Sequence, residues 1–327
     1  MADPFHLKIP TIKEIFVGDI ARSGNWIVAC VKSGVAWPVK VTNVKFRNRV
    51  LYLIPPTANP GERAYNTFPS VALALNPGER MEAGQILISQ FLSSLAWVTS
   101  SPIRVDEWTG GNLPRPMGGF NDVPFVTRDF YHPYLPNPSD RDSRLALAFY
   151  REGLGLNHAA YQCLSFFKVL NLFLRTGTQQ EAWINANFAH VTEQRAKQRA
   201  SFLVSTHGDV GRYLYGSNRC AVAHAGGSPT ADPEDPEDMR RLRDDLPLVR
   251  ALAEYAIEHQ FGIKSSTTVY REHLYELEGF RAIFGAERVD AIKASGSISE
   301  ADWPALPRLS VRLALHEPYA PLGPIDI

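Results

Sequence analysis

The sequence is poor in cysteine and has no excess of charge of either sign, and both features narrow what the protein can do. Its 327 residues include three cysteines, which lie far apart and lack the C-x-x-C spacing of zinc and redox sites. We therefore expect neither a disulfide framework nor a cysteine zinc site, and a reducing cytoplasm is the simplest compartment. Lys plus Arg and Asp plus Glu both number 34, so no overall field attracts the chain to nucleic acid or to an anionic membrane.

Long apolar runs, catalytic signatures and metal-ligand spacings are also missing from the sequence. The longest uncharged run, residues 83–103, is interrupted by serines, glutamines and a threonine, so it is not the apolar span that a membrane helix needs. The amino-terminal segment has acidic and proline residues and no apolar core of signal-peptide length. No Walker loop or G-x-S-x-G motif occurs, and His132, His158, His190 and His207 share no ligand spacing. The sequence thus predicts no membrane segment, no metal and no cofactor.

The first hundred or so residues have the pattern of a small sheet with one helix. Between residues 25 and 75, short β-branched runs alternate with stretches rich in proline, asparagine and glycine, which is typical of strands and turns. From residue 81 to 98 the apolar side chains instead recur at three and four positions, which predicts one amphipathic helix. We therefore expect a sheet-rich module over residues 1–110 with this helix packed on it.

A segment rich in glycine and proline, residues 111–138, follows this module. It has no sustained periodicity, so we interpret it as a linker and a domain boundary. Directly after it, Ser139 with Asp142 three residues later predicts a capping box at the start of a helix. Apolar residues at helical spacing then continue to about residue 262, with Asn157 as a candidate for a second helix N-cap.

The predicted fold class is therefore α+β. The amino-terminal sheet-rich module, residues 1–110, is followed by an all-α bundle over residues 139–262. A carboxy-terminal extension, residues 263–327, offers one more amphipathic helix at 270–285 and a strand-like stretch at 309–315.

One short segment of the helical region carries the residues with the clearest chemical potential. The stretch SNRCAVAHAGG, residues 217–227, places Arg219 five positions before His224 among small side chains. If residues 208–225 form a regular helix, the two side chains lie about 140° apart around its axis. The small neighbours leave room for the long arginine to lean toward the histidine. They would also let a second copy of the chain approach closely, so that the pair lies at a symmetric interface.

These side chains suit the cleavage of RNA without a metal ion. An imidazole that titrates near neutrality can exchange a proton with a ribose 2′-hydroxyl or a leaving 5′-oxygen, and a guanidinium binds phosphate oxygens in a bidentate manner. Asn218 would add a hydrogen bond to the same phosphate. In the alternative interpretation, Arg219 forms an ordinary surface or interface ion pair and His224 is a packed histidine of the core.

The helical region resembles a known family. Arg-x4-His late in a domain of four to five helices, after an apolar helix pair and before a turn with glycine, is similar to the HEPN domains, whose signature is Arg-x4-6-His. The segments LAFYREGLGLNHAAYQCLSFFKVLNL, RYLYGSNRCAVAHAGG and RRLRDDLPLVRALAEYAI look like the ApeA-like branch and the proteins called methylamine utilisation protein MauJ. The resemblance covers roughly residues 140–262.

The resemblance implies a helical bundle that dimerises so that two such motifs face each other, and in active members a metal-independent endoribonuclease. By position, Arg219 and His224 correspond to the motif. Active members usually carry Asn, Asp or His directly after the arginine, whereas this chain has Cys220, with the polar Asn218 before the arginine instead. Two hypotheses therefore remain: a homodimeric endoribonuclease whose amino-terminal module serves recognition or regulation, and a catalytically silent scaffold or binding protein, for example an accessory protein of methylamine utilisation.

A short basic run precedes the motif in the sequence. Arg195, Lys197 and Arg199 alternate with polar residues and could follow a phosphate backbone. A solvated face of a helix is the interpretation that we favour for this run.

Overall fold

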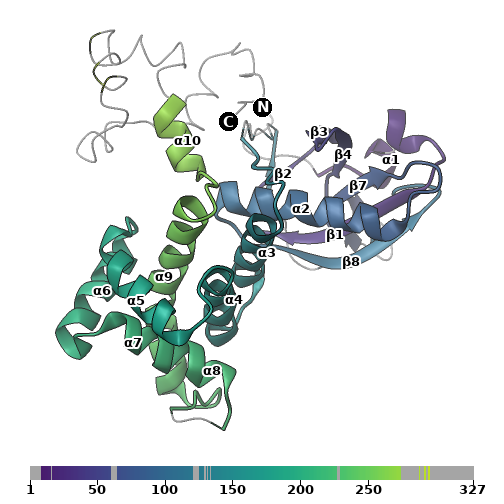
Figure 1. Ribbon diagram of the computed structural model, residues 1–327. Coiled ribbons are helices and arrows are strands. Elements are labelled where there is room, and N and C mark those ends of the chain that lie inside the picture. Colours follow the sequence, from purple (N-terminus) through teal and green to yellow (C-terminus); the bar gives the residue numbers. More distant parts are fainter. Residues whose placement is uncertain are drawn as a thin grey trace, which may run out of the picture. The chain divides into compact units, whose positions relative to one another are not determined.

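The chain consists of two compact units, Met1–Phe130 with Asn137–Ile263, and Tyr131–Pro136 with Lys264–Ile327. The first unit contains both a sheet and a set of helices (Figure 1). Within the second unit, helix α10 (Ser266–His273) is described, whereas the strand-like stretch at 309–315 and most of the helix expected at 270–285 lie outside the described residues. The computed structural model describes residues 9–15, 17–59, 65–120, 125–128, 130, 132, 134–226 and 229–273, and the single residues 287, 291 and 294.

An antiparallel sheet of five strands, in the order β3-β4-β7-β1-β8, forms the amino-terminal part of the first unit. The strands expected between residues 25 and 75 are confirmed, and the β-branched side chains of β1 and β7 are buried in the core. The bounds are β1 (Trp26–Ser33), β3 (Thr42–Phe46), β4 (Arg49–Ile54), β7 (Ser70–Ala74) and β8 (Ile103–Gly111).

Strand β8 was not among the predicted strands, because charged residues take up much of it. It nevertheless pairs with the whole of β1, from Trp26 opposite Gly111 to Ser33 opposite Ile103, with a bulge after Cys30. An edge strand keeps one side free of pairing, so charged side chains are tolerated there. Shorter strands complete this part of the chain: β2 (Trp37–Pro38) with β10 (Val126–Thr127), and β5 (Ala58–Asn59), β6 (Tyr65–Thr67) and β9 (Gly118–Phe120). Before the sheet lie two short helical turns, α1 (Ile12–Ile15) and η1 (Gly18–Ala21).

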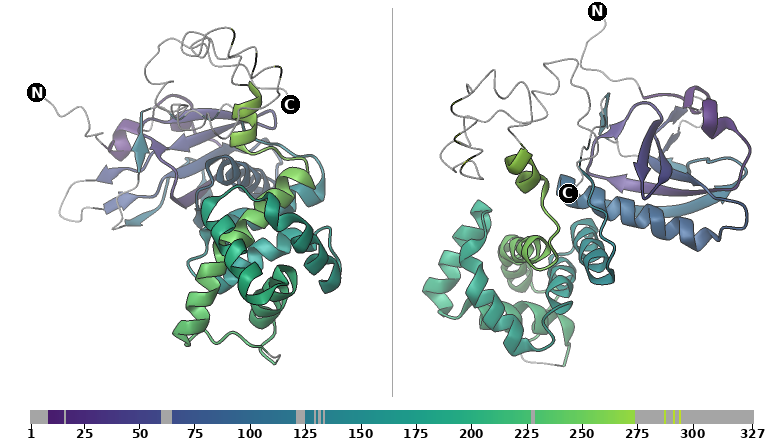
Figure 2. Two further views of the ribbon diagram at one scale, coloured as in Figure 1. Left: turned by 90° about the vertical axis from the view of Figure 1, so that its left-hand side faces the viewer. Right: turned by 45° about the horizontal axis from the view of Figure 1, so that its top comes forward.

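Helix α2 (Met81–Thr99) runs along one face of the sheet (Figure 2). The predicted amphipathic helix is thereby confirmed: its inner side chains are buried, and the Phe91 ring meets the ring of Phe46 edge to face at 5.7 Å. Gly84 lets the helix approach the sheet closely, because a Cβ atom there would come within 2.7 Å of the side chains of Ile27 and Leu75. One core of this part lies between α2 and the sheet, and a second cluster of buried side chains, which includes Ile20, Val28 and Phe68, contains no residue of α2.

Helices make up the rest of the first unit, so the α+β class is confirmed. Buried side chains of α3, α4 and α9, among them Phe166, Phe167 and Leu252, form their common core. The helical elements are α3 (Arg141–Gly155), α4 (Ala159–Asn171), α5 (Gly177–Asn187), η2 (Phe188–His190), α6 (Gln194–His207), α7 (Val210–Leu214), the π-helix η3 (Tyr215–Cys220), α8 (Ala221–Ala223) and α9 (Pro236–His259).

The two predicted helix caps are each one residue too early. The N-cap of α3 is Asp140, not Ser139, and its Oδ1 accepts a hydrogen bond of 2.8 Å from the Ser143 backbone N–H. The N-cap of α4 is His158, not Asn157, and no side chain caps that helix. A carboxylate accepts this bond better than a hydroxyl does near the positive helix end, which explains the first difference.

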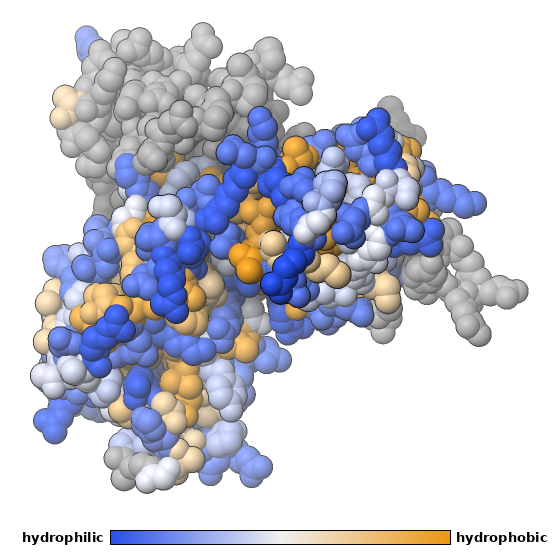
Figure 3. Space-filling view, turned by 45° about the vertical axis from the view of Figure 1, so that its right-hand side comes forward, coloured by the Kyte–Doolittle hydropathy of each residue, from blue (hydrophilic) through white to orange (hydrophobic). Residues whose placement is uncertain are grey.

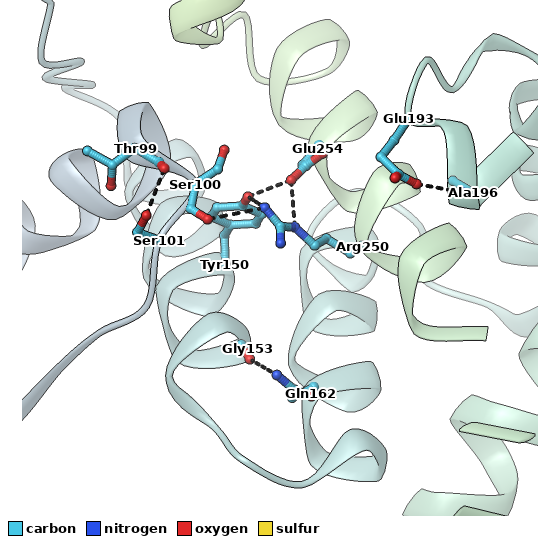
Figure 4. Close-up of polar contacts among 10 residues, drawn as sticks. All are labelled: Thr99, Ser100, Ser101, Tyr150, Gly153, Gln162, Glu193, Ala196, Arg250 and Glu254. Carbon is cyan, nitrogen blue, oxygen red and sulfur yellow. Dashed lines mark hydrogen bonds and ion pairs between the residues drawn. The ribbon is translucent and has the colours of Figure 1, made fainter. Parts of the chain in front are cut away.

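A buried tyrosine joins the sheet part to the helices of the first unit (Figure 4). Tyr150 of α3 donates a hydrogen bond of 2.5 Å to Glu254 Oε1 of α9, and Arg250 Nε donates to the same oxygen at 2.8 Å. Arg250 Nη2 also reaches the backbone carbonyl of Ser100, directly after α2, at 3.4 Å. The Trp97 ring packs edge to face on Tyr150 at 5.2 Å. Burial raises the pKa of the Tyr150 hydroxyl well above its ordinary value, so it is a donor here.

The surface is mixed in character. Figure 3 shows a largely hydrophilic face on which hydrophobic residues reach the surface in separate patches. The large exposed apolar residues come from different elements, for example Ile86 of α2, Tyr161 of α4 and Phe202 of α6. Among the residues that the structure describes, no helix is both long and apolar enough to span a membrane.

Candidate functional site

The segment that carries Arg219 and His224 is not one regular helix. The helix predicted for residues 208–225 is wrong in this respect: a single turn of α-helix, α7, leads into the π-helix η3, and α8 ends at Ala223. Within η3 the hydrogen bonds shift register, because Ala221 N–H donates to the carbonyls of Gly216 and Asn218. π-helical turns are rare and often lie at functional sites.

The two predicted side chains are in contact at the end of the helix, where the His224 backbone N–H still donates to the Cys220 carbonyl at 3.0 Å. His224 has left the helix, with φ −129° and ψ 98°, and its ring turns back toward the preceding turn. Arg219 Nη1 lies 3.1 Å from His224 Nε2. A guanidinium can only donate, so Nε2 accepts this hydrogen bond and the neutral ring carries its proton on Nδ1. His224 is exposed, which contradicts the alternative of a packed core histidine.

The guanidinium of Arg219 has further neighbours on its own turn. Its central carbon lies 5.5 Å from the centre of the Tyr215 ring, and Nη1 lies 3.8 Å from Cys220 Sγ. Helix α5 presses against this ring, because a Cβ atom on Gly177 would come within 2.6 to 2.8 Å of Tyr215. Burial raises the pKa of the Tyr215 hydroxyl, and the nearby Arg219 charge opposes that shift. The Tyr215 ring, which packs against α5, thus supports the guanidinium of Arg219.

Asn218 does not join the pair. Its side chain is fully buried, and its Oδ1 accepts a hydrogen bond of 2.9 Å from Arg241 Nη1 of α9. The structure therefore brings Arg219 and His224 together at the surface and places Asn218 on the opposite, inner side of the π-helix, against α9.

A buried carboxylate at the centre of α9 was missed by the sequence analysis. Asp245 is 0 % exposed, and it accepts hydrogen bonds from Arg199 Nε at 2.7 Å and from the Tyr213 hydroxyl at 3.2 Å. Burial raises the pKa of the Asp245 carboxyl, and the attraction of Arg199, Asn218 and Tyr213 offsets part of that rise. Because the side chain of Arg199 is only 15 % exposed, the interpretation as a solvated face is wrong for this member of the basic run.

The loop after His224 is acidic and lies beside the pair. The backbone N–H of Ala231 donates to the Ala221 carbonyl at 3.0 Å, so the loop folds back on α8. Asp232 and Glu234 follow and are exposed.

In the part of the chain that the structure describes, the predicted site residues form no metal site, and they do not line the hollow beside α1. Among the described residues, no group of histidine, cysteine and acidic side chains could hold a metal ion. A hollow of about 490 Å³ lies between α1 and the strand region, lined by Ile15, Val17 and Val41, and it contains none of the predicted site residues. Cys30 and Cys163 are buried, which raises the pKa of both thiols, whereas Cys220 beside the pair is partly exposed.

Comparison with known protein families gives a match in the helical part of the chain. The family model described as methylamine utilization protein MauJ matches residues 146–258, which extend from α3 to α9 and include Arg219 and His224. No curated protein and no solved structure matches the chain. The helical part of the chain is therefore similar to methylamine utilization protein MauJ over the segment that contains the candidate site.

Proposed function

We propose that the protein is a metal-independent endoribonuclease with a HEPN-type helical bundle, and that it acts as a homodimer. The contact of 3.1 Å between Arg219 Nη1 and the exposed His224 Nε2 carries this proposal. It pairs a group that binds phosphate with a group that transfers protons, at a distance that one phosphodiester can bridge.

The proposed reaction needs only these side chains and RNA. Arg219 donates its N–H groups to the non-bridging phosphate oxygens when RNA binds, and its bond to His224 Nε2 breaks, which frees the lone pair of that nitrogen. His224 Nε2 accepts the proton of the ribose 2′-hydroxyl, whose oxygen bonds to phosphorus while the bond to the 5′-oxygen breaks. The 5′-oxygen receives a proton from a second imidazolium or from water. The products are a 2′,3′-cyclic phosphate and a 5′-hydroxyl.

A dimer would supply the second imidazolium. The residues around His224 are small and exposed, including Ala223, Ala225 and Gly226, so a second chain can approach without large side chains in the way. In the proposed assembly two Arg219–His224 pairs face each other across a two-fold axis. Light scattering on the purified protein should then give twice the mass of the chain.

The decisive experiment compares cleavage by the wild type and by His224→Ala, with structured and unstructured RNA in EDTA. We expect the variant to lose nearly all cleavage and Arg219→Ala to lose most of it. The matched control is His190→Ala, which removes another exposed histidine of the helical part and should leave cleavage unchanged. Equal residual cleavage by the wild type and His224→Ala would rule out the proposed site.

A second candidate function is that of a catalytically silent binding or scaffold protein, such as an accessory protein of methylamine utilisation. Two observations favour it: the match to methylamine utilization protein MauJ, and Cys220 at the position where active HEPN relatives usually carry a polar residue. Cys220→Asn separates the two candidates. If cysteine silences an otherwise complete site, this variant gains EDTA-resistant cleavage that its double variant with His224→Ala lacks.

A further inference from the structure

The π-helix that carries Arg219 is bound to α9 through the side chain of Arg241. In a regular α-helix Ala221 N–H would donate to the Ser217 carbonyl, but here it donates to Gly216 and Asn218 instead. Arg241 Nη1 donates to that Ser217 carbonyl at 2.7 Å. The bond that the change of register removes is thus replaced by one from a residue 24 positions away.

Arg241 also forms a hydrogen bond with the π-helix at a second point. The same Nη1 donates to Asn218 Oδ1 at 2.9 Å, and Asn218 is the fully buried residue of η3. Nη2 in turn donates to Asp238 Oδ1 at 3.0 Å, one turn earlier on α9. A guanidinium holds its donors in one rigid plane, so a fork anchored by Asp238 fixes where Ser217 and Asn218 can lie.

The π-helix sets what supports the Arg219 side chain. Tyr215 and Arg219 both lie within it, and the Arg219 guanidinium lies 5.5 Å from the centre of the Tyr215 ring. In this arrangement the distance between Arg219 Nη1 and His224 Nε2 is 3.1 Å. We infer that Arg241 is a positioning residue for the Arg219–His224 pair: it holds the π-helix in the register in which Tyr215 supports Arg219 beside His224. Its effect on RNA cleavage rests on the proposed function, whereas its effect on the geometry does not.

The test reads the geometry and the reaction separately. Protein labelled with ¹⁵N-histidine is studied by NMR in alkaline buffer, with the ring signals of His224 assigned by their loss in His224→Asn. In the wild type Nδ1 should carry the proton, because Nε2 accepts from Arg219. Arg241→Met should shift the ring signals toward the other tautomer. The rate of RNA cleavage should fall about a hundredfold in kcat with little change in KM, since a misplacement of about 1 Å can cost that much.

Two further variants keep the inference falsifiable. Arg243→Met removes a charge of the same kind from an exposed position of α9 and should change neither the His224 signals nor cleavage. Arg241→Lys keeps the charge and the alkyl stem but loses the fork, so it should fold and still shift the His224 signals if Arg241→Met proves too unstable. Unchanged His224 signals in folded Arg241→Met or Arg241→Lys would overturn the inference. Shifted signals in a protein whose wild type cleaves no RNA would support the positioning role and refute the proposed nuclease.

Discussion

Helix α9 carries two arginine–carboxylate clusters that differ in burial and in what they hold. The site cluster, in the first half of the helix, consists of Arg241, Asp238 and Asp245 with Arg199, Tyr213 and Asn218 from neighbouring elements. The joint cluster, in the second half, consists of Arg250, Glu254 and Tyr150. The first holds an irregular turn beside Arg219, and the second holds the sheet part against the helices.

The two clusters differ in which side chain is fully buried, and we expect that side chain to contribute most to stability. In the site cluster the carboxylate Asp245 is 0 % exposed, so it depends entirely on its partners. In the joint cluster the Arg250 and Glu254 side chains are 34 % and 31 % exposed, so water supports the ion pair and its loss costs little. There the buried group is Tyr150, at 0 % exposure. The two clusters thus contain similar residue types, but the fully buried member is a carboxylate in the site cluster and a tyrosine in the joint cluster.

The largest effect is expected from Asp245→Ala. It leaves the Arg199 guanidinium, only 15 % exposed, without its carboxylate, and removes the acceptor of the Tyr213 hydroxyl. Breaking a buried pair in this way costs about 3 to 5 kcal/mol in the free energy of unfolding. Urea denaturation measures it, with Asp244→Ala, an exposed neighbour on the same helix, as the control that should change stability little. A loss no larger than that of the control would show that the site cluster is not held by its carboxylate.

Tyr150→Phe should come next in size. It removes one hydroxyl that bonds Glu254 and Arg250 and leaves the ring contacts with Trp97 and Phe166 in place. The expected loss is about 2 kcal/mol in the free energy of unfolding, as for a buried hydrogen bond to a charged group. The ring signals of His224 should stay as in the wild type, because the joint cluster does not touch the π-helix. Shifted signals would mean that the two clusters of α9 are coupled.

The regular parts of the fold were predictable from the sequence, whereas the features that shape the site were not. Strands β1, β4 and β7 and helix α2 were predicted because each shows its period within a few residues. The π-helix depends on Arg241, 24 residues after Ser217, and the buried Asp245 depends on Arg199, 46 residues before it. Hydrophobic periodicity carries no information about such distant polar partners.

The Arg219–His224 pair also shows how far a sequence pattern can predict the site. Arg219 and His224 were selected from residue type and spacing, and they meet because the helix ends at Ala223 and the long arginine reaches the histidine ring. Asn218 was selected for its polarity and lies buried, because the π-helix turns it toward Arg241. A pattern of residue types therefore indicated a pair of side chains, and the local backbone decides which side chains meet.

A smaller effect is expected from Gly177→Ala, which disturbs the Tyr215 ring that supports Arg219. The substitution touches neither cluster. The new methyl group would lie 2.6 to 2.8 Å from the Tyr215 ring, which must shift. We expect a loss of about 1 kcal/mol in the free energy of unfolding, at the low end for overpacking, together with a weaker Arg219–His224 contact seen in the His224 ring signals. Gly155→Ala, at the end of α3, is the control, because a Cβ atom there would lie 3.8 Å or more from its neighbours. Equal behaviour of the two variants would mean that Tyr215 adapts freely.

Thiol labelling tests whether the two clusters of α9 act separately. Burial raises the pKa of Cys30 and Cys163, and only thiolates react, so iodoacetamide under native conditions should modify the partly exposed Cys220 first. Cys163 Sγ lies 3.9 Å from the Leu242 carbonyl of α9, three residues before Asp245. Mass spectrometry should therefore find faster labelling of Cys163 in Asp245→Ala, which loosens this half of α9, and the wild-type rate in Tyr150→Phe. Equal acceleration of Cys163 labelling in both variants would mean that the two halves of α9 become mobile together and that the two clusters do not act separately.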